Sequence, residues 1–169
     1  MTTLWCEQAW VSGALAAGVR ITIAGGRIAT VESGVAATPD DERLAGLTIP
    51  GLANAHSHSF QRALRGHTQT GTGTFWTWRE QMYELASTVD PDRVHRLARA
   101  TFAEMVLAGI TVVGEFHYVH HDPSGAPYAD PNETGRAIIA AANEAGLRLT
   151  LLDACYLHGG IDRFRDTDT

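Results

Sequence analysis

The sequence predicts an α/β protein in which a small β module precedes the first part of a parallel (β/α)8 barrel. Residues 1–48 alternate apolar and polar positions between glycine turns, a pattern typical of short strands. Residues 49–169 instead repeat the order strand, loop, amphipathic helix, which is typical of a parallel sheet. The two helices expected there end at Gly109 and Gly146, 37 positions apart. That spacing fits the roughly 31 residues per βα unit of such a barrel, with somewhat longer loops.

The β module is expected to consist of short strands joined by tight turns. Residues 19–23 and 27–31 alternate with a period of two, and the Gly-Gly pair between them predicts a hairpin turn. Residues 33–42 combine Gly, Pro and three acidic residues and therefore predict an exposed loop. A module of this length is too short to bury a sizeable core unaided.

Three largely apolar runs predict the strands of the second part, at residues 48–55, 110–116 and 147–156. Such runs are typical of strands that are buried on both faces. Three strands cannot close a barrel, so we expect the chain to be the N-terminal part of a larger protein. A small open α/β sandwich that is complete in itself is the alternative.

Both predicted helices begin with an Asp-Pro pair. Asp is a favourable N-cap residue and Pro is tolerated in the first helical turn, so Asp90-Pro91 and Asp130-Pro131 predict two helix starts. At the second helix, Glu133 is placed to complete a capping box. A glycine closes each helix, as is common at helix C-termini.

Composition excludes several classes of function. The chain has 13 basic residues, all of them Arg, against 19 acidic residues, for a formal net charge of −6. The absence of Lys excludes a P-loop lysine and a Schiff-base lysine, and the acidic balance argues against a nucleic-acid partner. The two cysteines predict no disulfide framework. No apolar run approaches the roughly 18 residues of a membrane helix, so we expect a cytoplasmic protein with no membrane partner.

The clearest functional motif is PGLANAHSH at residues 50–58. On a strand, His56 and His58 would point to the same side, with Cα atoms about 6.5–7 Å apart. Two imidazole nitrogens at that separation can bind one metal ion. The motif follows an apolar strand, and barrel enzymes place their chemistry at the C-terminal ends of strands. We therefore expect a metal site, the alternative being two hydrated polar residues at a strand end.

Four segments together resemble the formimidoylglutamate deiminases of the amidohydrolase superfamily: residues 50–58, SFQRALRG at 59–66, FWTWREQMY at 75–83 and GEFHYVHH at 114–121. The resemblance covers essentially the whole chain but less than half of a family member. It implies an amidohydrolase-type (β/α)8 TIM barrel. It also implies that the preceding module is a small β-sandwich of the composite, urease-like kind.

The resemblance implies zinc-dependent hydrolysis of N-formimidoyl-L-glutamate to N-formyl-L-glutamate and ammonia, in histidine degradation. It implies that His56 and His58 bind zinc and that Gln61, Arg79 and Tyr118 bind the small anionic substrate. The remaining metal ligands and the proton-transfer residues are expected beyond this chain. No catalytic residue is therefore assigned, and the chain alone is expected to be inactive. The full-length protein is expected to be a homo-oligomer, namely a dimer.

The residue types support these roles unevenly. The guanidinium of Arg79 suits a carboxylate because its planar fork donates two parallel hydrogen bonds, although a surface Arg is an equal alternative. Gln61 is expected on a loop, where most glutamines only contact water. The alternative for Tyr118 is an aromatic side chain that packs at the rim of the barrel. Glu115 and His117 share strand parity, so either could reach the metal from the barrel interior, and a buried hydrogen-bonded pair is the alternative.

Two other functions stay open. Another deaminase of the superfamily would act on an aminated purine, pyrimidine or triazine ring. Arg79 discriminates against it, because a neutral ring offers no carboxylate to bind. The other alternative is a non-catalytic metal-binding or assembly fragment, which the length of the chain favours.

Overall fold

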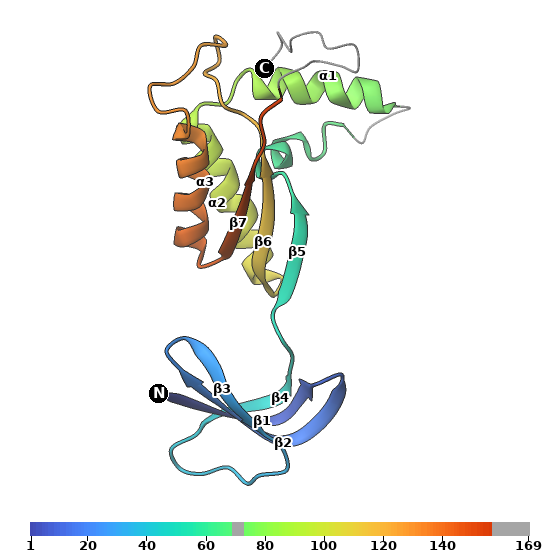
Figure 1. Ribbon diagram of the computed structural model, residues 1–169. Coiled ribbons are helices and arrows are strands. Elements are labelled where there is room, and N and C mark those ends of the chain that lie inside the picture. The colour runs from blue at the N-terminus through green and yellow to red at the C-terminus, as the bar shows by residue number, and fades with distance from the viewer. Residues whose placement is uncertain (69–72, 157–169) are drawn as a thin grey trace. The chain divides into compact units, whose positions relative to one another are not determined.

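The computed structural model describes residues 1–68 and 73–156, which belong to two compact units, Met1–Pro50 and Gly51–Thr169. Each unit has its own sheet (Figure 1). The elements, in chain order, are β1 (Thr2–Val11), β2 (Ala14–Ala24), β3 (Arg27–Glu32), β4 (Glu42–Thr48), β5 (Leu52–Ser57), the 3-10 helix η1 (Ser59–Leu64), α1 (Phe75–Ala86), α2 (Pro91–Leu107), β6 (Ile110–His117), α3 (Glu133–Ala145) and β7 (Arg148–Asp153).

The first unit is one mixed sheet with the strand order β3-β2-β1-β4. The predicted hairpin is present, because β2 and β3 pair antiparallel across Gly25 and Gly26, which have positive φ angles of 57° and 73°. The β-sandwich expected for this module is not seen within residues 1–50. Its strands all pair edge to edge in a single layer, with a small core of Cys6, Ala9 and Val19.

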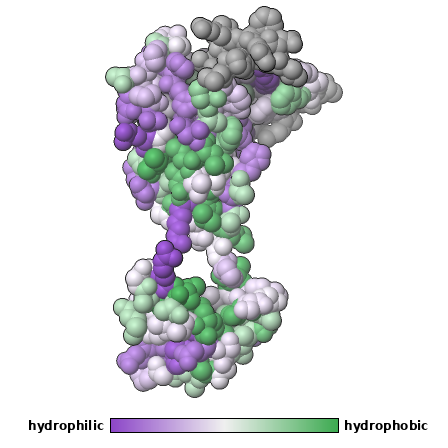
Figure 2. Space-filling model, viewed as in Figure 1, coloured by the Kyte–Doolittle hydropathy of each residue, from purple (hydrophilic) through white to green (hydrophobic). Residues whose placement is uncertain are grey.

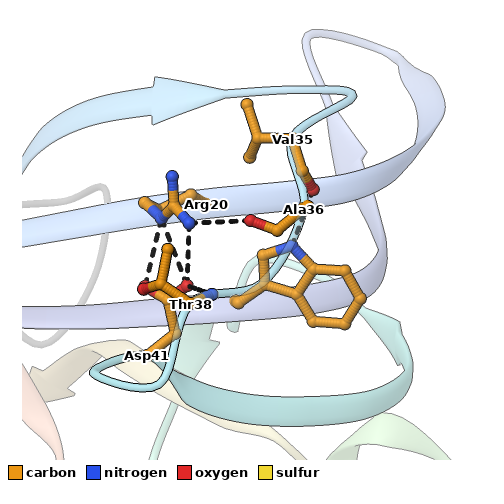
Figure 3. A network of polar contacts seen from close by, with 6 residues as sticks. Arg20, Val35, Ala36, Thr38 and Asp41 are labelled. Carbon is orange, nitrogen blue, oxygen red and sulfur yellow. Dashed lines mark hydrogen bonds and ion pairs between the residues drawn. The ribbon is translucent and has the colours of Figure 1, made fainter.

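Arg20 ties the segment after β3 to the sheet (Figure 3). Its Nη2 donates to the carbonyl of Ala36 at 2.8 Å and to Asp41 Oδ2 at 2.8 Å. The same carboxylate accepts from the backbone N–H of Thr38 at 2.7 Å. The hydrogen bond from Arg20 holds the pKa of Asp41 well below its usual range. The predicted loop is therefore anchored to β2 by a charged side chain.

The second unit has the predicted parallel arrangement, an open three-stranded sheet with the order β5-β6-β7. Helices α2 and α3 cover one face (Figure 1), and the core lies between them and the sheet. Phe102, Val113 and Ile138 are its central members. Among the described residues, no helix covers the opposite face of this three-stranded sheet. Figure 2 shows hydrophobic residues gathered on the surface of the second unit. No helix of the described ranges is long and apolar enough to cross a membrane.

The apolar run at residues 48–55 is not one strand, contrary to the prediction. β4 ends and β5 begins on either side of residues 49–51. Pro50 has no N–H to donate to a sheet ladder, which favours a break. Gly51 lies so close to β6 that an added Cβ would overlap the side chain of Thr111. Residues 49–51 therefore separate two strands that the apolar pattern alone joins.

The start of α3 also differs from the prediction. The helix begins at Glu133, and its N-cap, Asn132, makes no capping hydrogen bond through its side chain, so the predicted capping box is absent. Asp130 accepts from the backbone N–H of Asn132 at 2.9 Å and pairs with Arg136 at 2.6 Å. The Asp side chain therefore closes a turn before the helix instead of capping its first residue.

The start of α2 is as predicted, because Asp90 accepts from the backbone N–H of Arg93 at 2.7 Å. We expect Asp90→Ala to lower the free energy of unfolding by about 1 kcal/mol, since the cap is lost. Asp90→Asn keeps a capping oxygen and should stay within a few tenths of a kcal/mol of the wild type. Urea denaturation of the three proteins measures this, and equal stability of Asp90→Ala would show that the cap contributes nothing.

Candidate metal and substrate site

The carboxyl ends of β5, β6 and β7 lie at one edge of the sheet, with η1 and α1 beside them (Figure 1). A cavity of about 460 Å³ opens there. The five residues predicted to bind metal and substrate all line it: His56, His58, Gln61, Arg79 and Tyr118. The rest of its wall is apolar or aromatic: Phe75, Trp78, Met82, Tyr83, Phe116 and Tyr156. The structure thus brings together residues from β5, η1, α1 and the end of β6.

The two histidines converge on one point. Their Nε2 atoms are 3.0 Å apart and their ring centroids 5.0 Å apart. His56 is near the end of β5, whereas His58 follows the strand. The pairing of β5 with β6 is irregular between Asn54 and Ser57, and Asn54 Oδ1 accepts from the backbone N–H of His56 at 3.2 Å. A local irregularity of this kind re-aims side chains, as strand bulges beside active sites do.

The ring of His58 is oriented by the neighbouring strand. Its Nδ1 lies 3.3 Å from the carbonyl oxygen of Phe116, and because a carbonyl only accepts, this hydrogen bond selects the tautomer with the proton on Nδ1. The lone pair is then on Nε2, which faces His56. Metal-binding histidines usually have this kind of outer partner. Two nitrogens bound to one tetrahedral zinc at ~2.0–2.1 Å lie roughly 3.3 Å apart, so the pair fits zinc.

Glu115 and His117 do not line the cavity. This corrects the interpretation in which either residue reaches the metal from the barrel interior. Both are buried, at 1% and 2% exposure. Along β6 they share the face of Val113, which packs on α2 and α3, so strand alternation turns both toward the helices. Glu115 accepts a hydrogen bond from the backbone N–H of Ser59, directly after His58. Each residue is hydrogen bonded, but not to the other.

Gln61 and Tyr118 form a pair at the cavity wall. Gln61 Nε2 donates to the Tyr118 hydroxyl at 2.6 Å, so the hydroxyl proton is left to donate elsewhere. In the structure it points to Met82 Sδ at 3.5 Å, a weak acceptor. Burial raises the pKa of Tyr118, which keeps the phenol protonated at neutral pH. The pair therefore offers a hydrogen-bond donor that a stronger acceptor, such as a carboxylate, would attract.

Arg79 brings a positive charge to the cavity. It is on α1, whose first turn is fixed by a reciprocal capping box between Thr74 and Thr77. Its Nη2 donates to the Tyr83 hydroxyl at 2.7 Å, and its Cζ lies 4.6 Å from the centroid of that ring. Within residues 1–68 and 73–156, no carboxylate lies within ion-pair distance of Arg79. The guanidinium is therefore held in place without being neutralised.

A second group of metal-type side chains was missed by sequence reasoning. One donor atom each from His117, His120 and Asp153 lies within 4.8 Å of the others, close enough to hold a cation. Both imidazoles are already hydrogen bonded, His117 Nε2 to the Thr134 hydroxyl at 3.0 Å and His120 Nε2 to the Ala154 carbonyl at 2.8 Å. The group therefore joins β6, β7 and α3 through hydrogen bonds. The H-x-x-H spacing of His117 and His120 at the end of β6 was the available signal.

Burial lowers the pKa of His117 from 6.5 to about 4, with His120 adding to the shift and Asp153 opposing it. A depressed histidine pKa stabilises the fold fully above about pH 6.5, and this stability is lost as the pH falls toward 4. We expect the wild type to lose roughly 3 kcal/mol more than His117→Gln between pH 7 and pH 4. Urea denaturation at several pH values measures this difference. If the free energies of unfolding of the wild type and of His117→Gln fall in parallel between pH 7 and pH 4, the lowered pKa of His117 is contradicted.

Comparison with known proteins decides the family. Residues 47–159 match the Amidohydrolase family. The chain belongs to the amidohydrolase family. Residues 1–45 match a second description, the N-terminal domain of the formimidoylglutamate deiminase HutF. The resemblance found in the sequence motifs is therefore confirmed over both parts of this amidohydrolase chain.

Relatives agree with this assignment. The chain is 40% identical over 163 residues to formimidoylglutamate deiminase from Pseudomonas aeruginosa, covering 95% of this chain and 36% of that protein. It resembles the crystal structure of an amidohydrolase from Brucella melitensis with 42% identity and a TM-score of 0.92, covering 99% of this chain and 38% of the other. Atrazine chlorohydrolase from Arthrobacter aurescens, solved with zinc, shares the fold at 23% identity and a TM-score of 0.77, covering 99% and 39%. The chain therefore spans less than two fifths of each relative.

Proposed function

We propose that the protein, expressed from its complete reading frame, hydrolyses N-formimidoyl-L-glutamate to N-formyl-L-glutamate and ammonia in histidine degradation. The observation that carries the proposal is one cavity that combines a convergent histidine pair with Arg79, which has no carboxylate partner among the described residues. A metal-dependent hydrolase that acts on a dianion needs metal ligands and a cationic group for a carboxylate. The 40% identity to a named formimidoylglutamate deiminase supports the choice of substrate.

We propose that His56 and His58 hold a zinc ion through their Nε2 atoms. When bound, zinc supplies Lewis-acid activation that allows hydrolysis near neutral pH. His58 keeps its ring orientation through Phe116, so its contribution to the site is to present a fixed lone pair. The remaining ligands and the proton-transfer groups are proposed to come from other strands of an amidohydrolase-type (β/α)8 barrel, in which β5, β6 and β7 are the first three. A homodimer and a cytoplasmic location stay predictions.

The substrate carboxylates are proposed to bind Arg79 and the pair of Gln61 and Tyr118. The guanidinium offers two parallel N–H donors to one carboxylate, and the Tyr118 hydroxyl offers a further donor. The aromatic walls of the cavity lower the local dielectric, which strengthens each of these charge-assisted bonds. Binding at the carboxylates would then orient the formimidoyl group toward the histidine pair.

A ring deaminase is the second candidate, because the aromatic lining of the cavity could stack an aminated heterocycle. Phe75, Trp78 and Phe116 contribute such rings. Arg79 argues for the dianion, since burying a guanidinium against a neutral ring would leave its charge unpaired. The two candidates are distinguished by assaying ammonia release from N-formimidoyl-L-glutamate and from an aminated purine.

We expect Arg79→Met to lower kcat/KM for N-formimidoyl-L-glutamate by about 30- to 1000-fold, equivalent to roughly 2–4 kcal/mol, because a substrate carboxylate loses its cation. Arg79→Lys should recover only part of this loss, since an ammonium cannot reproduce the planar fork. Steady-state measurement of ammonia release tests both variants. Unchanged kinetics for Arg79→Met would favour the ring deaminase.

Removal of either cavity histidine should abolish tight zinc binding. We expect the wild-type protein from the complete reading frame to retain about one zinc per chain after dialysis, and His56→Ala and His58→Ala to retain far less. His95→Ala is the matched control, because His95 lies on α2 and pairs with Glu144 away from the cavity. Metal analysis measures the content. A His58→Ala protein with full zinc occupancy would place the metal elsewhere.

A further inference from the structure

We propose that Tyr83 is a positioning residue that holds Arg79 for carboxylate binding and thereby sets the preference for an acidic substrate. This inference rests on the proposed function and deepens it. Sequence reasoning assigned no role to Tyr83, which follows Arg79 by one helical turn on α1. Residues four apart on a helix face the same side, so the two side chains meet without help from other elements.

Two separate contacts join the pair. The Tyr83 hydroxyl accepts from Arg79 Nη2 at 2.7 Å, and the ring lies beneath the guanidinium, with Cζ 4.6 Å from the centroid. The ring contact is a cation–π interaction that sets the plane of the guanidinium. The hydroxyl contact sets its rotation within that plane. Trp76 is the other aromatic partner of Arg79, at 6.0 Å, so Tyr83 supplies the closer restraint.

The contacts leave Arg79 available to a ligand. An arginine has five N–H donors, and Tyr83 accepts from Nη2 alone. Tyr83 is also neutral, so it orients the charge without cancelling it, which a carboxylate in the same position would do. An arginine that is already oriented loses less conformational freedom when a carboxylate binds. The preorganised guanidinium therefore favours substrates with a carboxylate over those with a neutral group.

The position of Tyr83 agrees with a role in the cavity. Tyr83 is partly exposed and lines the cavity beside Arg79. Loss of this hydroxyl releases Arg79 Nη2 from its acceptor and should therefore weaken carboxylate binding and leave the hydrolytic step unchanged.

The test is Tyr83→Phe in the protein expressed from its complete reading frame, since Phe keeps the ring and its packing. The substrates are N-formimidoyl-L-glutamate and the two analogues in which the α- or the γ-carboxylate is a carboxamide. We expect KM for the dianion to rise roughly tenfold with kcat within about twofold, the pattern for a lost ground-state contact with a charged group. The preference for the dianion over one of the two amides should fall by the same factor.

A direct binding measurement separates this inference from the proposed function. Glutarate, a dicarboxylate without the reactive group, should bind the wild type and bind Tyr83→Phe roughly tenfold more weakly by calorimetry. If the wild type binds glutarate, Tyr83→Phe binds it roughly tenfold more weakly and the wild type releases no ammonia from N-formimidoyl-L-glutamate, the proposed function fails while the role of Tyr83 stands. If the wild type is active and Tyr83→Phe keeps its KM, its substrate preference and its glutarate affinity, the role of Tyr83 is overturned.

The matched control is Tyr128→Phe. The Tyr128 hydroxyl is buried without a hydrogen-bond partner among the described residues, and Tyr128 does not line the cavity. Its removal should therefore leave KM, kcat and glutarate affinity unchanged. A Tyr83→Phe protein that loses kcat equally on all three substrates would indicate a structural role and would contradict the proposal. Thermal unfolding of each variant verifies that the fold is retained.

Discussion

Two hydrogen bonds between the end of β5 and β6 are the constraint on which the candidate site depends. The ring of His58 is bonded to the carbonyl of Phe116, and the next backbone N–H, that of Ser59, is bonded to Glu115. Together they hold the chain at the point where a strand becomes the 3-10 helix η1. The first bond directs the lone pair of His58 toward His56. The second fixes the start of η1, which carries Gln61 to Tyr118.

The cavity combines two kinds of environment that follow from this arrangement. On the sheet side, imidazole nitrogens converge within 3.0 Å, which suits a cation. On the side of α1, a guanidinium lies among aromatic rings without a carboxylate partner in the described part of the chain. The proposed substrate, with an anionic end and a hydrolysable end, would match both environments. The low dielectric of the aromatic wall makes each polar contact stronger and more selective than it would be in water.

Sequence reasoning succeeded where the determinants are local and failed where the sheet intervenes. The hairpin before β3, the cap of α2 and the βα order were predicted correctly because each depends on a few neighbouring residues. The predicted start of α3 was wrong because the Asp130 side chain closes a turn by accepting from the backbone N–H of Asn132. Glu115 was open to two interpretations because strand parity does not say which face of β6 the helices will cover.

The sequence by itself determined the alternation of parallel strands with α2 and α3, the family motifs and the residue types that the chemistry needs. Only the tertiary structure decided which of these residues share a cavity and how they are oriented. Gln61 and Tyr118, which are hydrogen bonded, are 57 positions apart, and His58 and Phe116 are 58 positions apart. Such contacts depend on the register of β5 against β6 and on an irregularity within it. Local patterns do not fix that pairing, because β5 and β6 are not joined by a tight turn that would set their register.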